Sequence, residues 1–341
     1  MNTKRTFLLS LMGAAVLSMF AMKAQAQSGP IVIKFSHVVA ANTPKGLASE
    51  YFAKRATELT GGKVKVEVFA NSVLYKDKEE LEALQLGAVE MLAPSLAKFG
   101  QLGFRDFEVF DLPYIFPNRQ SLRTITQGPI GKRLLTQLEE RGIKGLSYWD
   151  NGFKVMSLNA PLRLPSDLQG KRMRIQPSKV IEAQMTALGA ESVPLPFSDA
   201  YRALRTGLVD GTENPPSNLY SQKMHEVQQY VAVTNHGYLG YAVIANKKFW
   251  DGLSADEKKI LQLGIDPSRL IYEIPDHIEQ GWDIIWATMD RLRESPPDVP
   301  VLIVWDSIGG AVPKGPSNRA GSSRSLLRAL RRSWRTTLGL R

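Results

Sequence analysis

"IVIKFSHVVAANTPKGLASEYFAKRATELTGGKVKVEVF" (residues 31–69) decides the fold class of this chain. Apolar residues alternate with other residues in 31–37 and again in 63–69, which is the pattern of a β-strand with one buried face. The segment between them, 42–62, predicts a helix, because it begins with Thr-Pro, a favourable N-cap and first residue, and ends with two glycines. A strand, a helix and a strand at this spacing predict a right-handed βαβ unit with parallel strands.

The α/β alternation continues beyond this unit. Residues 77–90 predict another helix, and further alternation extends to about residue 250. With 341 residues, the chain is long enough for about two domains with hydrophobic cores. Ligands of open α/β sheets bind beyond the carboxyl ends of the strands. Ser36 and His37 lie at the end of the first strand, so we predict site residues there, with a loop imidazole of no special role as the alternative for His37.

The composition excludes some chemistry and makes the net charge uninformative about the ligand. The chain has no cysteine, so disulfides, thiolate metal sites and cysteine nucleophiles are excluded. Of the net charge of +10, seven charges are arginines within 315–341 and three lie within the first 26 residues. Residues 27–314 are therefore neutral overall, and the high isoelectric point does not indicate a nucleic-acid partner.

The first residues have the organisation of a secretory signal peptide. Lys4-Arg5 precede an apolar segment, 7–22, and Ala-Gln-Ala follows at 24–26. We predict cleavage after Ala26 and export of the remainder. A membrane-spanning helix is the alternative, but the apolar segment is short for that role.

Two later segments combine polar side chains with a constrained backbone. In "GKRMRIQPSKV" (170–180), the strand pattern sets Arg174 and Gln176 opposite the apolar residues, and a planar guanidinium suits a carboxylate ligand. An ordinary solvated or salt-bridged arginine would give the same pattern. In "LVDGTENPPSNLY" (208–220), Asn214 precedes a proline and is therefore extended, so its amide could bind a carboxylate or could stabilise a turn.

The sequence contains no motif of the common catalytic sites. It has no G-x-S-x-G elbow, and His225-Glu226 is not followed by a second histidine at zinc-protease spacing. "GPIGKR" (128–133) lacks the spacing and the Ser/Thr of a phosphate loop. We therefore predict a protein that is not an enzyme and that needs neither a metal nor a cofactor.

Six segments, in order, closely resemble the substrate-binding proteins of tripartite ATP-independent periplasmic (TRAP) transporters, C4-dicarboxylate type, over about residues 30–262. They are "FSHVVAANTPKG", "NSVLYKDKEELEALQLGAVEMLAPS", "YWDNGFKVMSLNAPL", "KRMRIQPSKV", "GAESVPLPFSDAYRALRTGLVDGTENPPSNLYSQKMHEVQQY" and "HGYLGYAVIANKKFW". The resemblance implies a two-lobed, type II-like periplasmic-binding-protein fold of the α/β class. It implies a periplasmic receptor that closes over a small organic acid and delivers it to a TRAP permease, with no nucleic-acid partner.

The resemblance also implies lobe boundaries and site residues. Lobe one would comprise 27–149 plus 240–262, and lobe two 150–239. The family's carboxylate-binding arginine falls on Arg174, and its ligand-bonding asparagine falls on Asn214. Where relatives specific for sialic acid carry a second arginine, this sequence has a lysine. Including that lysine, the further residues expected to contact the ligand are Lys154, His37, Asn151, Gln176, Phe197, His236 and Tyr238.

The family pattern breaks off near residue 263. Residues 263–314 resemble a fragment of a RecA-like recombinase, whose Walker B acid would fall on Asp306, yet the chain has no G-x-x-x-x-G-K-[ST] phosphate loop. We expect a truncated receptor without the family's usual C-terminal helices, fused to a chimeric or mis-assembled C-terminus. Residues 315–341 are expected to be a disordered basic tail, or else a basic amphipathic helix. The alternative function is a recombinase fragment that binds ATP and DNA.

Overall fold

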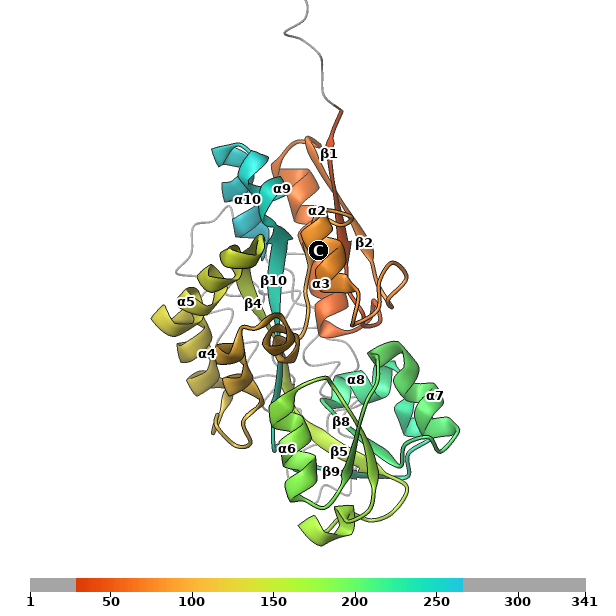
Figure 1. Ribbon diagram of the computed structural model, residues 1–341. Coiled ribbons are helices and arrows are strands. Elements are labelled where there is room, and N and C mark those ends of the chain that lie inside the picture. Colours follow the sequence, from red (N-terminus) through yellow and green to blue (C-terminus); the bar gives the residue numbers. More distant parts are fainter. Residues whose placement is uncertain (1–28, 266–341) are drawn as a thin grey trace, which may run out of the picture. The chain divides into compact units, whose positions relative to one another are not determined.

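The computed structural model describes residues 29–265, which form two five-stranded mixed sheets with helices packed against them (Figure 1). The predicted signal peptide, the recombinase-like segment from residue 266 onward and the basic tail lie outside the described residues. The α/β class predicted from the sequence is confirmed. No helix in the described range is both long and apolar enough to cross a membrane.

The first sheet is built around the βαβ unit. Its strand order is β2-β1-β3-β10-β4, in which β1, β2 and β3 are parallel and β10 is antiparallel to both of its neighbours. The register of β1 on β2 runs from Ile31 opposite Val64 to Ser36 opposite Phe69. The bounds are β1 Ile31–Ser36, β2 Val64–Phe69, β3 Met91–Leu92, β4 Ile143–Phe153 and β10 Tyr238–Asn246.

Helices cover both faces of the first sheet. Every residue of β10 is buried: Ala242 and Ile244 pack into one core, and Val243 and Ala245 pack into the other. The second of these cores includes α2, α9 and α10, and the first includes α3, α4 and α5. The bounds are α2 Pro44–Leu59, α3 Glu80–Leu86, α4 Arg119–Gln127, α5 Pro129–Gln137, α9 Lys247–Gly252 and α10 Ala255–Ile265, with the 3₁₀ helices η2 Leu96–Leu102, η3 Arg105–Asp111 and η4 Leu138–Arg141.

The two predicted helices of this region form with shorter bounds than expected. Thr43 is the N-cap of α2, since its side chain accepts a hydrogen bond from the amide of Gly46, and Pro44 is the first helical residue, as predicted. The helix predicted at 77–90 is only α3, because the residues before Glu80 form turns and Gly87 ends the helix in the left-handed conformation (φ 76°). Glycine adopts this conformation without the steric cost of a Cβ.

The second sheet has the order β7-β6-β8-β5-β9, with β6 parallel to β7 and β8, and β5 antiparallel to β8 and β9. The chain passes into it between Phe153 and Val155 and leaves it between Ala232 and Tyr238. We call the first sheet with its helices the first half, and the second sheet with its helices the second half. The bounds are β5 Val155–Leu158, η5 Pro165–Leu168, β6 Arg172–Ile175, α6 Lys179–Ala187, β7 Glu191–Pro194, η6 Phe197–Asp199, α7 Ala200–Arg205, β8 Gly211–Asn214, α8 Pro216–Ser221, η7 Met224–Glu226 and β9 Tyr230–Ala232.

Candidate functional site

Arg174, on β6, is a fully buried cation whose direct partners are neutral. Its alternation with Met173 and Ile175, which lie in the core, agrees with the predicted strand faces. Its side chain is 1% exposed, so the alternative of a solvated arginine is wrong. The Nε and Nη2 atoms of Arg174 both donate to the carbonyl oxygen of Leu195, at 3.0 and 2.7 Å, whereas Nη1 is buried without a hydrogen-bond partner. The Phe197 ring lies 5.7 Å from the guanidinium carbon.

Burial of this guanidinium has an energetic consequence. Removal from water lowers the pKa of Arg174, although three carboxylates in its surroundings, Asp77, Glu213 and Asp199, act in the opposite direction. None of the three is a direct hydrogen-bond or ion-pair partner of Arg174. A buried charge without a paired counter-ion is costly. An anionic ligand at Nη1 would supply the counter-charge.

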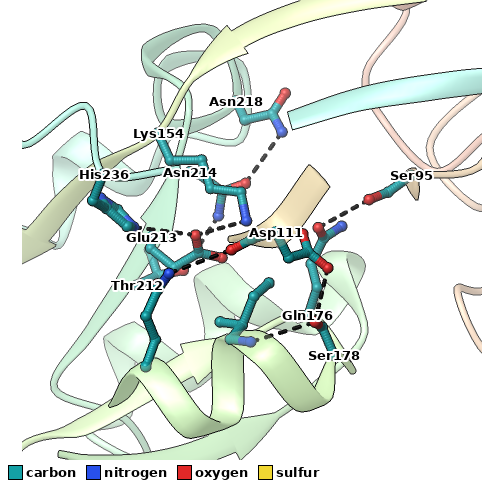
Figure 2. Close-up of polar contacts among 12 residues, drawn as sticks. Ser95, Asp111, Lys154, Gln176, Ser178, Thr212, Glu213, Asn214, Asn218 and His236 are labelled. Atoms are coloured by element: carbon teal, nitrogen blue, oxygen red, sulfur yellow. Dashed lines mark hydrogen bonds and ion pairs between the residues drawn. The ribbon is translucent and has the colours of Figure 1, made fainter. Parts of the chain in front are cut away.

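Asn214 belongs to a series of side-chain amides that begins beside the Arg174 strand (Figure 2). Thr212 donates its hydroxyl to the backbone oxygen of Arg174 at 3.3 Å and accepts from the amide of Asn214 at 3.2 Å. Asn218, on α8, donates to the Asn214 side-chain oxygen at 3.2 Å. These side chains are buried, and the bonds fix the orientation of the Asn214 amide.

The series continues into the first half. The amide of Asn151, on β4, donates to the Asn218 oxygen at 3.1 Å and to the hydroxyl of Tyr241 at 2.8 Å. The Tyr241 ring in turn lies beneath the ammonium of Lys45, 3.8 Å from its centroid. A continuous set of polar contacts therefore runs from β8 to the first turn of α2.

Lys45 is a second fully buried cation without a carboxylate in direct contact. Its ammonium donates to the backbone oxygen of Ala93 at 2.8 Å. Burial is the main reason why the pKa of Lys45 falls to about 7, with Lys98 lowering it further while Glu80 and Asp77 raise it. Lys45 thus lies near the boundary between its charged and neutral forms at neutral pH.

Buried polar groups also lie at the carboxyl end of β1, close enough to Lys45 for its charge to act on one of them. Ser36 and His37 are both 0% exposed, the Ser36 hydroxyl has no hydrogen-bond partner, and the Val39 backbone acts on the His37 ring as a hydrogen-bond partner, with poor geometry. Burial, together with the charge of Lys45, lowers the pKa of His37 to about 3, so the imidazole is neutral at neutral pH. Buried polar groups usually have hydrogen-bond partners, so these side chains are candidates for binding a polar ligand.

Gln176 connects the two halves. It follows β6, and its side-chain oxygen accepts a hydrogen bond from the Ser95 hydroxyl of the first half at 3.0 Å. Ser95 also pairs with Tyr241 through a backbone bridge. Gln176 was predicted to share the strand face of Arg174, and its bond to Ser95 (Figure 2) lies next to Tyr241, the residue whose ring contacts the Lys45 ammonium.

Lys154 differs from Arg174 and Lys45 because its charge is already paired. Its ammonium lies 2.9 Å from the Glu213 carboxylate, and the His236 ring lies 3.5 Å from the same oxygen (Figure 2). Thr234 is hydrogen bonded to the other ring nitrogen of His236 at 2.7 Å. Burial alone would raise the pKa of Glu213, but Lys154 and His236 outweigh it and lower the pKa.

Tyr238 packs in the core of the first half. Its ring makes edge contacts with Phe116 and Phe153, and burial raises the pKa of its hydroxyl well above the usual value, with a further contribution from hydrogen-bonded Asp150. The Tyr238 ring is thus held by core packing, and its expected contact with a ligand stays a prediction. In the described part of the chain, no group of three or more His, Asp or Glu residues could hold a metal ion.

Sequence reasoning missed Lys45, Ser95, Asn218 and Tyr241. A detectable signal existed for Lys45: it is the second residue of α2, and a cation in the first helical turn opposes the helix dipole. A lysine at this unfavourable position indicates that some interaction other than helix formation requires the positive charge there. Tyr241 gave no signal, because a tyrosine within the apolar strand 238–246 reads as an ordinary core residue.

Residues 35–273 match the bacterial extracellular solute-binding protein family 7. The chain belongs to this family. The match extends beyond residue 262, where we expected the family pattern to end. The chain is 62% identical over 258 residues to the C4-dicarboxylate-binding periplasmic protein DctP of Rhodobacter capsulatus, covering 76% of this chain and 77% of that protein. It is 46% identical to the C4-dicarboxylate-binding protein DctB of Bacillus subtilis, covering 68% and 66%.

Solved structures of TRAP periplasmic solute-binding proteins share the fold. One from Sulfurospirillum deleyianum, with bound succinate, is 41% identical with a TM-score of 0.69, covering 78% of this chain and 84% of that one. One from Pseudomonas aeruginosa, with bound L-malate, is 40% identical with a TM-score of 0.69, covering 78% and 90%. The predicted resemblance to TRAP solute-binding proteins is thereby confirmed.

Proposed function

We propose that this chain is a non-enzymatic periplasmic receptor that binds a C4-dicarboxylate or a related organic acid and delivers it to a TRAP permease. The observation that carries the proposal is the pair of buried cations, Arg174 and Lys45, that have no carboxylate in direct contact. Two such charges on one connected set of polar side chains suit a ligand with two carboxylates. The similarity to succinate- and malate-binding proteins supports the same class.

One carboxylate of the ligand would bind Arg174 and Asn214. The free Nη1 of Arg174 and the amide of Asn214 are donors on neighbouring strands, β6 and β8. The guanidinium is already oriented by Leu195, so little conformational entropy is lost when the anion binds. Phe197 would cover the guanidinium and exclude water, which strengthens the ion pair.

The second carboxylate would bind Lys45, with Ser36 and His37 as hydrogen-bond donors. Each of these residues has a buried polar atom that can face a ligand oxygen. His37 is neutral at neutral pH and therefore contributes one N–H donor rather than a charge. Gln176, Ser95 and Tyr241 would connect this end of the ligand to the other.

We propose that Lys154 and His236 do not contact the ligand and instead hold in place the residues that do. Lys154 was expected to offer a point charge to the anion, yet Glu213 already neutralises it. Glu213 directly precedes Asn214 on β8, so fixing its side chain between Lys154 and His236 would stabilise the strand that presents the Asn214 amide. Asn151 would act similarly, through its bond to Asn218.

The proposal also covers the leader, the relation of the two halves and the absence of a cofactor. We propose that the leader is cleaved after Ala26, that the two halves are lobes that close over the acid, and that no cofactor takes part. The alternative of a recombinase fragment finds no support in the comparisons, because the matched family spans residues 35–273.

A ligand screen tests the proposal. The chain from residue 27 to 341 would be melted with succinate, L-malate, fumarate, 2-oxo acids, acetate and ATP. We expect the largest rise in melting temperature with one or more dicarboxylates, which can neutralise both cations, a smaller rise with acetate, which can neutralise one of them, and none with ATP. Stabilisation by ATP, or no response to any carboxylic acid, would contradict the proposed function.

A further inference from the structure

The segment between β7 and α7 determines the surroundings of Arg174. The carbonyl oxygen of Leu195 accepts both bonds from the guanidinium, and Phe197 places its ring 5.7 Å from the guanidinium carbon. Residues 195–199 are too few to form a core of their own. Their position, and with it the position of the Arg174 side chain, depends on what holds this turn.

Asp77, which lies 120 residues earlier in the first half, binds this turn. One oxygen of its carboxylate accepts a hydrogen bond from the backbone N–H of Phe197 at 2.7 Å. The other oxygen lies 2.7 Å from the ammonium of Lys98. Both ends of this contact are buried. The contact therefore connects the first half to the Arg174 turn through a charged group held in place by an ion pair.

A second contact between the halves lies beside the first but differs from it in burial. Lys76 pairs with Asp199 at 3.3 Å, with side chains that are 48% and 27% exposed. Exposed pairs contribute little because water and salt screen them, whereas charge-assisted hydrogen bonds in buried surroundings are stronger. The buried contact of Asp77 is thus the stronger of the two.

The Asp77 carboxylate is ionised throughout the physiological range. Burial alone would raise its pKa, but the charges of Lys98 and Arg174 and the hydrogen bond from Phe197 lower it to about 2. The negative charge also acts on Arg174, which it approaches without direct contact. Asp77 therefore partly compensates the guanidinium and leaves its Nη1 free.

We propose that Asp77 is a positioning residue for ligand binding, which holds the 195–199 turn so that Leu195 and Phe197 present the Arg174 guanidinium to an anion. This inference rests on the proposed function of Arg174. It adds a residue that would not touch the ligand: the contact between Asp77 and Phe197 joins the two halves, and the same contact orients Arg174.

Glu80 provides a matched control for Asp77. It is also a buried carboxylate paired with Lys98, but it makes no bond to the 195–199 turn. Removing either charge weakens the same ion pair and costs stability. Only removal of the Asp77 carboxylate affects the turn.

The experiment compares Asp77→Ala, Asp77→Asn and Glu80→Gln in the chain from residue 27 to 341. Succinate affinity and dissociation rate would be measured at a temperature where all variants are folded. The hydrogen exchange of the Phe197 backbone amide and the NMR resonance of the Arg174 Nε–H would be recorded with and without succinate.

We expect a roughly 10- to 100-fold loss of succinate affinity for Asp77→Ala, mainly through faster dissociation, because this is the usual cost of a lost hydrogen bond to a charged group. Asp77→Asn keeps an acceptor and should lose less, and Glu80→Gln should stay within about threefold.

The outcomes separate this proposal from the proposed function. Faster Phe197 exchange and a shifted Arg174 resonance in Asp77→Ala, absent in Glu80→Gln, support positioning whether or not succinate is the ligand. Unchanged Phe197 exchange and Arg174 resonance in Asp77→Ala overturn it, as does equal loss of affinity in Asp77→Ala and Glu80→Gln. If the unmodified chain binds no carboxylic acid, the proposed function fails, and the two ligand-free readouts still decide the role of Asp77.

Discussion

Two buried cations, Lys98 in the first half and Arg174 in the second, differ in whether a carboxylate is in direct contact with them. Lys98 is paired with two carboxylates, Asp77 at 2.7 Å and Glu80. Arg174 is bonded only to the backbone oxygen of Leu195 and keeps one nitrogen without a partner. Both side chains are at most 2% exposed, so burial does not distinguish them. Under the proposed function, the protein itself neutralises the charge of Lys98 and leaves that of Arg174 for a ligand.

The same distinction separates the other two buried lysines. Lys154 is paired with Glu213, whereas Lys45 contacts only a backbone oxygen and the ring of Tyr241. An unpaired buried cation costs stability, and binding sites commonly retain such costs because the ligand relieves them. The comparison therefore predicts that paired cations affect folding and unpaired cations affect binding.

The largest expected effect is on folding, from Lys98→Met. This substitution leaves Asp77 and Glu80 as buried carboxylates without their counter-ion. Removing one partner of a buried pair costs about 3–5 kcal/mol, and urea unfolding should show this loss in the free energy of unfolding. A loss below about 1 kcal/mol would mean that the ion pairs of Lys98 with Asp77 and Glu80 do not stabilise the fold. The exposed pair of Lys54 and Glu58 offers a control, since Lys54→Met should change stability by less than about 1 kcal/mol.

The next effect is on ligand selection, from Lys45→Met. Loss of the ammonium should weaken dicarboxylate binding by roughly 10- to 100-fold, the usual range for a lost charged hydrogen bond, without a loss of stability. Binding of a monocarboxylate, which needs only Arg174, should change by less than about threefold. Calorimetric titration with succinate and with butyrate measures both. Equal weakening for the two ligands would remove Lys45 from the second carboxylate position.

A smaller effect follows from the depressed pKa of Lys45, which is about 7 in the folded chain. Above that pH the ligand-free protein loses the proton, and a dicarboxylate must restore it to bind. Affinity should therefore fall with rising pH above 7, by at most about tenfold per pH unit, while below pH 7 it should be nearly constant. Lys45→Arg stays charged and should abolish the slope, provided that it folds. A slope that persists in Lys45→Met would assign the dependence to another group.

The stability of the ligand-free protein should change with pH in the direction opposite to the ligand affinity. The unfolded chain has the ordinary lysine pKa and holds the proton between about pH 7 and 10.5, where folded Lys45 has released it. The stability of the ligand-free protein should therefore rise with pH in this window and be lower at or below pH 7. Lys45→Met should flatten that rise in urea titrations at pH 7 and pH 9.

The sequence pattern was informative where the interaction is local. Alternation in 172–175 predicted the faces of β6, and Thr43-Pro44 predicted the start of α2. The pattern could not show that Arg172 and Arg174, two residues apart on one face, would have such different exposure, because the cover over Arg174 comes from residues 195–199. The bond from Asp77 to Phe197 crosses 120 residues of chain, and no local pattern contains it.

The central claim is that Arg174 is left unpaired for a ligand carboxylate, and calorimetric titration of succinate into Arg174→Met tests it most directly. Arg172→Met is the matched control, because Arg172 lies on the same strand but is partly exposed and paired with Asp210. We expect Arg174→Met to be at least as stable as the unmodified chain and to lose roughly 30-fold or more in affinity, since truncating one partner of a buried charge pair costs at least about 2 kcal/mol. Arg172→Met should retain binding within about threefold. Succinate binding undiminished in Arg174→Met would contradict the account.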